Sequence, residues 1–342
     1  MKSIMVFLFC LCCFVLFGQN LIANGGFEER NCEPIFASQP CTGCQQLHCC
    51  NYWFNPLDAS TSDYYTNMAG CTVKLPNTIS GTINPYSGNA IVGFILSIQF
   101  LSNYHEYIST ALIQKLQKGQ KYNLTLSLAK GESSGSVFTC GGNMNTLGNN
   151  NGYSNHFGFY FSTDSIHESI NDFLSFTPQI EIEEVIVLGP TEWKTYHLSF
   201  IAEDEYKFLT IGNFFPNSST TMIANDPFYG VTAYYYIDDV SLEQDLTYHP
   251  EGKIIEPNVF TPNGDGVNDF FVPVLAEHIE SYELSILNRW GEQVFFTNKL
   301  NVGWDGKIGD NIGPDGVYYW NMIYKDNNGK EGIQRGYLTL LH

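Results

Sequence analysis

Seven cysteines follow residue 19, and their chemistry depends on where the chain folds. They are Cys32, Cys41, Cys44, Cys49, Cys50, Cys71 and Cys140. The Cys41–Cys44 spacing suits zinc, with His48 as a further ligand. In an exported chain disulfides are the default, so we expect at least one bridge within Cys41–Cys50, with zinc as the alternative. Seven is odd, and Cys140, alone in a polar stretch, is the expected free thiol.

Residues 131–135, Gly-Glu-Ser-Ser-Gly, match the G-x-S-x-G elbow of serine hydrolases. That elbow needs a strand, a strained turn that carries the serine, and then a helix. A strand is expected before it, but the sequence of residues 136–142 does not favour a helix. We therefore predict a Ser/Gly-rich loop and no catalytic residues, with a hydrolase as the alternative.

Oxygen-bearing side chains gather in Pro257–Phe271, PNVFTPNGDGVNDFF. Asn263, Asp265 and Asp269 could bind calcium, because hard cations prefer clustered oxygen ligands. The segment is not an EF-hand, because Val274 stands where the bidentate glutamate is required. Asn and Asp also build turns unaided, so a turn-rich loop without an ion is the alternative.

Aromatic side chains are abundant, with 21 Tyr, 25 Phe and 5 Trp. Flat rings stack on the apolar faces of sugars, so some of these residues could form a binding platform. Trp53, Tyr64, Tyr65 and Trp193 are the candidate ligand-binding residues. Many rings must pack in the interior, and any single ring is more often a core residue than a ligand contact.

Length and charge limit the class of protein. A chain of 342 residues can hold two domains. The formal net charge of −19 argues against nucleic-acid binding, because no basic surface is available for phosphates. It also disfavours adsorption to anionic membranes, whereas an acidic surface supports solubility and attracts cations.

The first 19 residues are expected to form a secretory signal peptide. Lys2 is basic, and Ile4–Phe17 is a nearly unbroken apolar run that is short for a membrane span. Cleavage is expected near Gly18 or Gln19. No later segment has the composition of a transmembrane helix, so the mature chain is expected to lack one.

The remaining chain shows the two-residue periodicity of β-strands. Tyr122–Leu128 alternates strictly between apolar and polar residues, as a half-buried strand does. About nine such strands predict a β-sandwich over residues 20–244. Residues 245–256 lose the periodicity and predict a linker. Residues 257–342 hold about six or seven strands, which predict a smaller immunoglobulin-like sandwich.

The C-terminal module contains several motifs in a fixed order: Pro257–Phe271, Tyr282–Glu292, Gly303–Gly306, Pro314–Trp320 and Gly336–Leu340. This order resembles the gliding-motility-associated C-terminal domain, the type B sorting signal of type IX secretion. The resemblance implies an address to the cell surface, with the type IX secretion machinery as partner. The residues assigned to the sorting signal are Pro257, Asn263, Gly264, Asp265, Gly266, Asn268, Asp269, Asn288, Arg289, Trp290, Gly291, Trp304, Asp305, Gly306, Gly316 and Tyr318.

The N-terminal module begins with Asn20–Glu28, NLIANGGFE, and ends with Tyr234–Leu242, YYYIDDVSL. Both segments resemble the first and last strands of carbohydrate-binding-like (galactose-binding-like) jelly rolls. In that group an acidic residue after the first strand and an aspartate of the last strand meet at a structural calcium ion. The resemblance therefore implies that Glu28, Asp238 and the Gly26 carbonyl share a calcium ion. The alternative is that the carboxylates only cap turns.

The same group contains a Trp–Pro, Asp-Tyr-Tyr, Cys order, which this sequence shows between Trp53 and Cys71. There the cysteine after the first strand pairs with the cysteine after Asp-Tyr-Tyr. The resemblance implies a Cys32–Cys71 disulfide in this chain.

These observations predict an all-β protein with an N-terminal jelly-roll β-sandwich followed by a smaller immunoglobulin-like sorting domain. The protein is expected at the cell surface or outside the cell, exported by type IX secretion. Its N-terminal domain is expected to be non-catalytic and to bind polysaccharide or mediate adhesion. The alternatives are a surface hydrolase of glycans or esters, and a purely structural component of a motility or biofilm surface.

Overall fold

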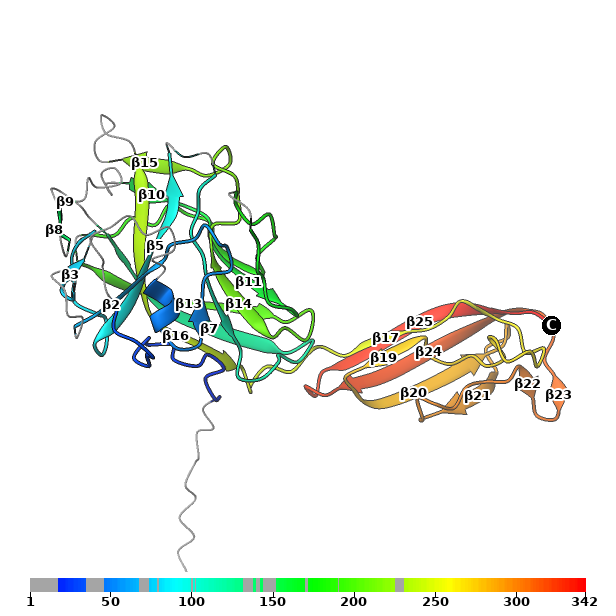
Figure 1. Ribbon diagram of the computed structural model, residues 1–342. Coiled ribbons are helices and arrows are strands. Elements are labelled where there is room, and N and C mark those ends of the chain that lie inside the picture. Colours follow the sequence, from blue (N-terminus) through cyan, green and yellow to red (C-terminus); the bar gives the residue numbers. More distant parts are fainter. Residues whose placement is uncertain are drawn as a thin grey trace, which may run out of the picture. The chain divides into compact units, whose positions relative to one another are not determined.

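The computed structural model shows two compact units, residues 1–246 and residues 247–342 (Figure 1). The structure describes residues 18–34, 46–67, 74–78, 80–99, 101, 103–131, 138–139, 142–143, 152–169, 172–189, 191–224 and 231–342. The predicted signal peptide up to residue 17 lies outside this part, as do Cys41, Cys44, Cys71 and Cys140. Among the described residues, no helix is long and apolar enough to cross a membrane.

The N-terminal unit contains two five-stranded antiparallel sheets, ordered β1-β6-β14-β11-β12 and β13-β7-β16-β5-β2. The strands of the first sheet are β1 (Trp53–Phe54), β6 (Ile108–Ala111), β11 (Phe157–Ser162), β12 (Ile180–Ile182) and β14 (Phe208–Gly212). Those of the second are β2 (Asp63–Thr66), β5 (Ala90–Ile98), β7 (Lys121–Lys130), β13 (Trp193–Ile201) and β16 (Thr232–Gln244). Smaller elements are the 3-10 helix η1 (Gln46–Cys49), β3 (Asn77–Thr78), β4 (Gly81–Thr82), β8 (Phe138–Thr139), β9 (Gly142–Asn143), β10 (Gly152–Ser154) and β15 (Met222–Ala224).

Strands that follow one another in the chain mostly lie in opposite sheets. From β5 to β16 they build a four-strand set β13-β7-β16-β5 facing a four-strand set β6-β14-β11-β12. This is the strand order of a jelly roll made of two Greek keys. The predicted all-β jelly roll is therefore confirmed by the strand order itself.

The core between the sheets comes from the alternating apolar residues. Leu124, Leu126 and Leu128 of β7 are fully buried, as are Phe157 and Phe161 of β11. Each such side chain contributes roughly 1.5–3 kcal/mol when it leaves water. The same alternation directs the intervening residues of β7 to the outer face of the sheet, because successive side chains of a strand point to opposite faces.

The disulfide seen in the structure joins Cys32 to Cys49, so the predicted Cys32–Cys71 bridge is wrong. Arg30 and Cys50 form an antiparallel bridge, which brings the two segments alongside each other. The Cα atoms of Cys32 and Cys49 are consequently 4.9 Å apart, which suits a disulfide. Local pairing of neighbouring segments determines the partner.

Cys50 is a free, buried thiol, whereas the thiol expected to be free, Cys140, lies outside the described residues. Burial raises the pKa of the Cys50 thiol. The one His/Cys/Asp/Glu cluster of metal-ligating geometry in the described part of the chain is Cys32, His48 and Cys49. Its two sulfur atoms are bonded to each other, so it is not a zinc site. With Cys49 bonded to Cys32 and Cys50 free, the bridge predicted within Cys41–Cys50 would join Cys41 to Cys44, which lie outside the described residues, so it stays a prediction.

The C-terminal unit is built on a five-stranded sheet ordered β18-β25-β24-β20-β21. Its strands are β18 (Val259–Phe260), β20 (Ile279–Leu287), β21 (Gln293–Thr297), β24 (Gly316–Asp326) and β25 (Glu331–Leu340). Two short ribbons accompany it, β17 (Lys253–Ile255) with β19 (Leu275–Glu277), and β22 (Lys307–Ile308) with β23 (Asn311–Ile312). Because β17 pairs with β19, the predicted linker 245–256 is too long, and its last residues belong to this unit.

One face of this sheet is buried and the other is exposed. Leu284, Met322 and Leu338 are fully buried in a core that also holds Phe260 and Trp304. On the opposite face, the exposed apolar side chains include those of Val317, Tyr319, Ile323, Ile333 and Tyr337. The layer opposite the sheet consists of short ribbons and connecting segments, in contrast to the two full sheets of the immunoglobulin-like expectation.

Candidate functional site

A polar groove lies on the outer face of β13, β7 and β16. The cross-strand pair Ser127 and Thr195 share a hydroxyl hydrogen bond of 2.9 Å. In the next outward pair, Thr125 lies 3.3 Å from Nδ1 of His197. Strand alternation therefore places a row of hydroxyl and imidazole groups along the face that does not contact the core.

A bulge in β16 brings a carboxylate to this row. The pairing of β16 with β7 shifts register between Asp238 and Ser241, and Asp239 has a φ of 52°. Bulges bend a strand and redirect a side chain. The groove has a volume of about 500 Å³ and is lined by Asn20, Gly25, Gly26, Tyr86, Thr125, Ser127, Thr195, His197, Asp239, Val240 and Ser241.

Tyr86 forms the aromatic wall of the groove, and Trp193 supports it. Tyr86 is 46% exposed, and its ring packs edge-on against Trp193 with centroids 6.0 Å apart. The Trp193 indole N–H donates to the Asn84 carbonyl at 3.0 Å, and Thr195 donates to the Tyr86 hydroxyl at 3.3 Å. The ring is thus held in place while one part of it stays open to solvent.

Three of the four predicted ligand-binding aromatics are core residues, and their assignment is corrected here. Trp53, Tyr64 and Tyr65 are 3%, 0% and 1% exposed. The Tyr64 hydroxyl donates to the Phe27 carbonyl at 2.8 Å inside the core. A buried ring has no free face for a sugar, so only Trp193 of the predicted set lies beside a groove.

The predicted calcium ligands Glu28 and Asp238 both contact the turn 86–90, beside the bulge in the middle of β16. Glu28 accepts the backbone N–H groups of Asn89 and Ala90 at 2.7 and 3.0 Å. Asp238 is fully buried and accepts the N–H of Ser87 at 3.0 Å. Residues far apart in the sequence therefore hold the same turn, and the calcium ion that the resemblance implied stays a prediction.

The turn 86–90 is shaped by this carboxylate cluster. Gly88 has a φ of 59°, and a Cβ at this position would lie 2.2 Å from Glu28 Oε1. Ser87 donates its hydroxyl to Asp239 at 2.8 Å, and Asp239 Oδ1 lies close to Gly26. The cluster therefore includes Asp239 in addition to the predicted residues.

The cluster carries uncompensated negative charge. Burial raises the pKa of Asp238 to about 7, and the charges of Asp239 and Glu28 add to the shift, against the backbone hydrogen bonds from Ser87 and Asp239. None of the three carboxylates forms a salt bridge with a residue in the described ranges. Their oxygens do not all lie within 4.8 Å of one another, so an ion here would also need backbone carbonyls such as that of Gly26. This donor set fits calcium better than a transition metal.

The weaker predicted calcium loop is held together by its own hydrogen bonds. Asp269 accepts the N–H groups of Gly264 and Gly266 at 2.7 and 2.8 Å. Asp265 accepts the N–H of Val267 at 2.7 Å, and Asn263 accepts the N–H of Asp265 at 3.0 Å. These are turn-building contacts, which favour the ion-free alternative for this loop.

The other residues assigned to the sorting signal divide into turn, core and surface positions. Asn288 accepts the N–H groups of Trp290 and Glu292, both at 3.0 Å, and so closes the β20–β21 turn. Trp304 and Tyr318 are core residues whose ring centroids lie 4.8 Å apart. Trp290 is 76% exposed, so this turn presents a large apolar side chain to solvent.

A buried acid pair, Asp63 and Glu106, was not predicted. Glu106 is 2% exposed and accepts hydrogen bonds from Tyr104 at 3.0 Å and from the Ile95 N–H at 2.7 Å. Asp63 accepts the Tyr234 hydroxyl at 2.8 Å. Burial first and the Glu106 charge second raise the pKa of Asp63 to about 8, against the lowering effect of its hydrogen bond from Tyr234. Glu106 is closed off from solvent, so the pair does not form an accessible acid–base couple.

This pair predicts a pH-dependent stability. The pKa of the Asp63 carboxyl group is higher in the folded than in the unfolded chain. The folded state is therefore most stable below the unfolded-state pKa, where the group is protonated in both states. It loses that stability as the pH rises from the unfolded-state pKa to the folded-state pKa. We expect the Asp63 contribution to decline between about pH 4 and pH 8, by up to about 6 kcal/mol, since each unit of pKa shift corresponds to about 1.4 kcal/mol. Urea unfolding of residues 20–246 at several pH values measures it. Asp63→Asn should flatten the profile relative to the unsubstituted fragment; parallel profiles would refute this origin.

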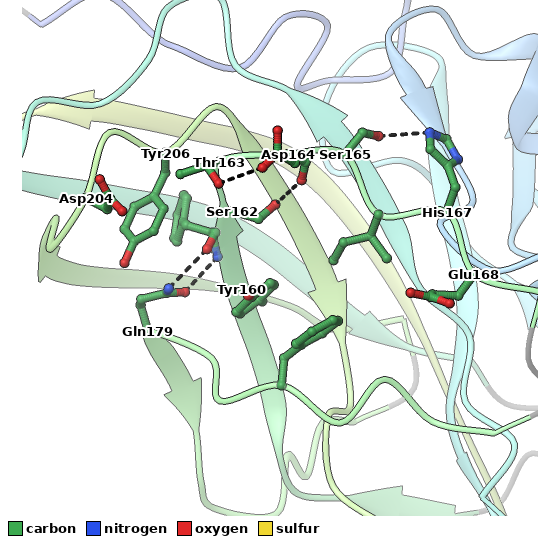
Figure 2. A pocket seen from close by; sticks show the side chains of 13 residues that line it. Tyr160, Ser162, Thr163, Asp164, Ser165, His167, Glu168, Gln179, Asp204 and Tyr206 are labelled. Atoms are coloured by element: carbon green, nitrogen blue, oxygen red, sulfur yellow. Dashed lines mark hydrogen bonds between the residues drawn. The ribbon is translucent and has the colours of Figure 1, made fainter.

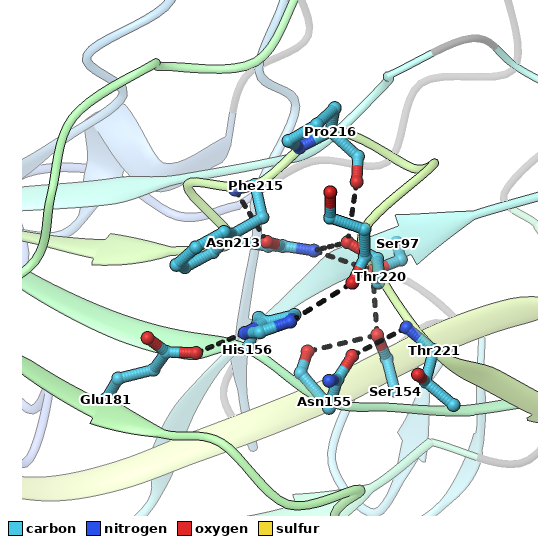
Figure 3. Close-up of polar contacts among 11 residues, drawn as sticks. Ser97, Ser154, Asn155, His156, Glu181, Asn213, Phe215, Pro216, Thr220 and Thr221 are labelled. Atoms are coloured by element: carbon cyan, nitrogen blue, oxygen red, sulfur yellow. Dashed lines mark hydrogen bonds and ion pairs between the residues drawn. The ribbon is translucent and has the colours of Figure 1, made fainter.

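Another polar cluster holds the residue types of a hydrolase but not their arrangement (Figure 3). The His156 ring bonds the Glu181 carboxylate through Nδ1 and faces the Ser219 carbonyl at 3.2 Å through Nε2. The Ser97 and Ser154 hydroxyls bond each other at 2.8 Å. Neither ring nitrogen of His156 bonds a hydroxyl group in the described part of the chain, so no activated serine is formed.

Residues 254–340 match the family described as the CHU_C type IX secretion signal domain. The match confirms the predicted sorting domain. It implies the type IX secretion machinery as a partner, and export to the cell surface or the extracellular space. No curated protein matches the sequence.

Several solved structures share a distant similarity with the chain. One, described as "CBM4 structure and function", is 10% identical, covers 66% of this chain and 99% of its own, and has a TM-score of 0.30. The K3 cleaved adhesin domain of Lys-gingipain from Porphyromonas gingivalis w83 is 13% identical, with 53% and 91% coverage and a TM-score of 0.25. The glycoside hydrolase domain of Endo-D from Streptococcus pneumoniae R6 is 9% identical, with 82% and 37% coverage and a TM-score of 0.22. The assignment of the jelly roll therefore rests on the strand order of this chain alone.

Proposed function

We propose that the protein is an exported, non-catalytic surface adhesin whose jelly roll binds polysaccharide in the groove of β13, β7 and β16. The observation that carries the proposal is the partly exposed aromatic ring of Tyr86, which lies beside a row of hydroxyl, imidazole and carboxylate groups. The sorting domain brings this groove to the outside of the cell.

The groove supplies both kinds of contact that a sugar ring requires. The face of Tyr86 is apolar and packs on the C–H face of a pyranose. Thr125, Thr195 and His197 offer donors and acceptors for sugar hydroxyls, and Asp239 offers a charged acceptor. Since Trp193 and the sheet fix the wall and floor, little side-chain freedom is lost on binding.

The arrangement of acids supports binding rather than hydrolysis. Glycoside hydrolysis generally uses two carboxyl groups that flank the scissile bond. Asp239 is the one Asp or Glu among the described residues that line the groove. A polysaccharide in the groove would therefore be held without being cleaved.

We expect the fragment 20–246 to bind a subset of polysaccharides on a glycan array, and Tyr86→Ala to weaken that binding about tenfold, which corresponds to about 1.4 kcal/mol. Tyr52→Ala is the matched control, because Tyr52 is 57% exposed and does not line the groove. Binding that survives Tyr86→Ala unchanged would place the ligand elsewhere. A fragment that binds no glycan would leave the purely structural surface role as the better account.

A further inference from the structure

A second cavity of the N-terminal unit, of about 520 Å³, lies beside the end of β11 (Figure 2). It shares no lining residue with the groove of β13, β7 and β16. Its walls come from β11, from the segment that follows it, from residues 176–179 and from residues 204–206. It is therefore a separate site, and its chemistry can be considered by itself.

The cavity has an aromatic floor. Phe159 and Phe161 point into the core between the sheets, so Tyr160 points to the other face of the strand, where it packs against a smaller cluster that includes Phe214. The Tyr160 ring stacks on that of Phe176 with centroids 4.7 Å apart and planes 8° apart. Gln179 accepts the Phe161 N–H at 2.7 Å and donates to the Phe161 carbonyl at 3.1 Å, which ties residues 176–179 to β11.

The rim of the cavity is acidic. Asp164, Glu168 and Asp204 line it, all three are exposed, and no Lys or Arg is among the lining residues. None of the three forms a salt bridge with a residue that the structure describes. Figure 2 shows Asp204 and Glu168 on opposite sides of Tyr160.

The position of Glu168 on this rim is fixed by the backbone. Its N–H donates to the Pro56 carbonyl at 2.9 Å, and its carbonyl accepts the Asp58 N–H at 3.1 Å. A parallel bridge between Leu57 and Glu168 joins the same two segments. The segment that carries the exposed carboxylate is therefore anchored through its backbone.

The charges surround the cavity rather than meet at a point. In the described part of the chain, Asp164, Glu168 and Asp204 do not bring their oxygens within 4.8 Å of one another, as a metal ion would require. Separated carboxylates around an aromatic floor suit an organic cation, which can place a positive charge over a ring face and donate hydrogen bonds to the rim.

We infer that this cavity binds a primary ammonium group, of the kind carried by an amino sugar. The ammonium group sits over the Tyr160–Phe176 stack, where the separate carboxylates of the rim attract its positive charge. The polar lining at Ser162 and Thr163 is available to the hydroxyl groups of a sugar ring. This inference does not rest on the groove of β13, β7 and β16, and either site can exist without the other.

Titration calorimetry of the full chain tests the inference with three probes: a glucosamine trisaccharide, its fully N-acetylated form, and tri-lysine. We expect the glucosamine trisaccharide to bind at least tenfold more tightly than the acetylated form, which lacks the ammonium charge. Added salt should weaken the binding, because the rim is exposed. Tighter binding of tri-lysine than of the glucosamine probe would identify a peptide amine as the source of the ammonium group.

The variants Glu168→Gln and Asp204→Asn should each weaken binding of the glucosamine probe several-fold without changing the melting temperature. Glu203→Gln is the matched control, because Glu203 is exposed, lies next to Asp204 in the chain and does not line the cavity. Equal binding of the acetylated and free forms would overturn the inference. So would unchanged binding by the Glu168 and Asp204 variants.

Discussion

Removal of residues 247–342 is expected to abolish surface display and leave the N-terminal unit in the periplasm. The reason is that the type IX secretion signal match lies entirely within this unit, at residues 254–340. The cut belongs at residue 247 rather than at residue 257, because β17 pairs with β19 and would otherwise stay behind without its partner. Protease shaving of intact cells of a type IX-secreting host, followed by fractionation, measures the loss, which we expect to exceed tenfold.

The reciprocal experiment controls for misfolding of the truncated chain. Residues 247–342 fused behind a signal peptide and a periplasmic reporter should bring the reporter to the cell surface. The full-length Tyr86→Ala variant should be displayed normally, because Tyr86 belongs to the other unit. Shaving of the truncated chain to the same extent as the full chain would show that the address lies elsewhere.

Calcium is expected to raise the melting temperature of the fragment 20–246. We propose that Glu28, Asp238 and the Gly26 carbonyl hold an ion, supported by the convergence of Glu28, Asp238 and Asp239 on the turn 86–90 without a cationic partner among the described residues. An ion that binds only the folded state stabilises by about 2–4 kcal/mol at 100- to 1,000-fold excess over its dissociation constant. This corresponds to a shift of roughly 5–15 °C for a domain of this size. Calorimetry with calcium and with chelator measures it.

Glu28→Gln and Asp238→Asn should each remove the calcium dependence, whereas Glu203→Gln should preserve it. Binding should tighten as the pH rises through about 7, because Asp238 must lose its proton to become a ligand. If the unsubstituted fragment melts at the same temperature with calcium and with chelator, these carboxylates only cap the turn 86–90.

The fold was predictable where one residue pattern dominates. The strict alternation of apolar and polar residues in Tyr122–Leu128 predicts a strand with one buried face. The structure confirms this strand as part of β7. The sorting domain was predictable because several separate motifs recur in order. The short ribbons of the second layer of the C-terminal unit were not predictable, because strands as short as β17 and β19 leave little periodic signal.

The candidate site was less predictable, because it depends on contacts between distant segments. Tyr65 lies on β2, at the edge of its sheet. Leu75 and Ile83 belong to the same buried cluster as Tyr65, and without them its ring would face solvent. The partner of Cys32 was likewise decided by the pairing of its segment with residues 49–51. Tyr86 could not be distinguished from other rings, because its exposure depends on where the turn 86–90 meets β13 and β16.

Binding of a labelled polysaccharide, chosen from the glycan array, to intact cells tests the central claim most directly, because it requires both export and the groove. Cells with the full chain should bind the label, cells with the chain truncated before residue 247 should not, and cells that display the Tyr86→Ala variant should bind about tenfold less. Equal labelling of cells that display the full chain and cells that display the Tyr86→Ala variant would contradict the account.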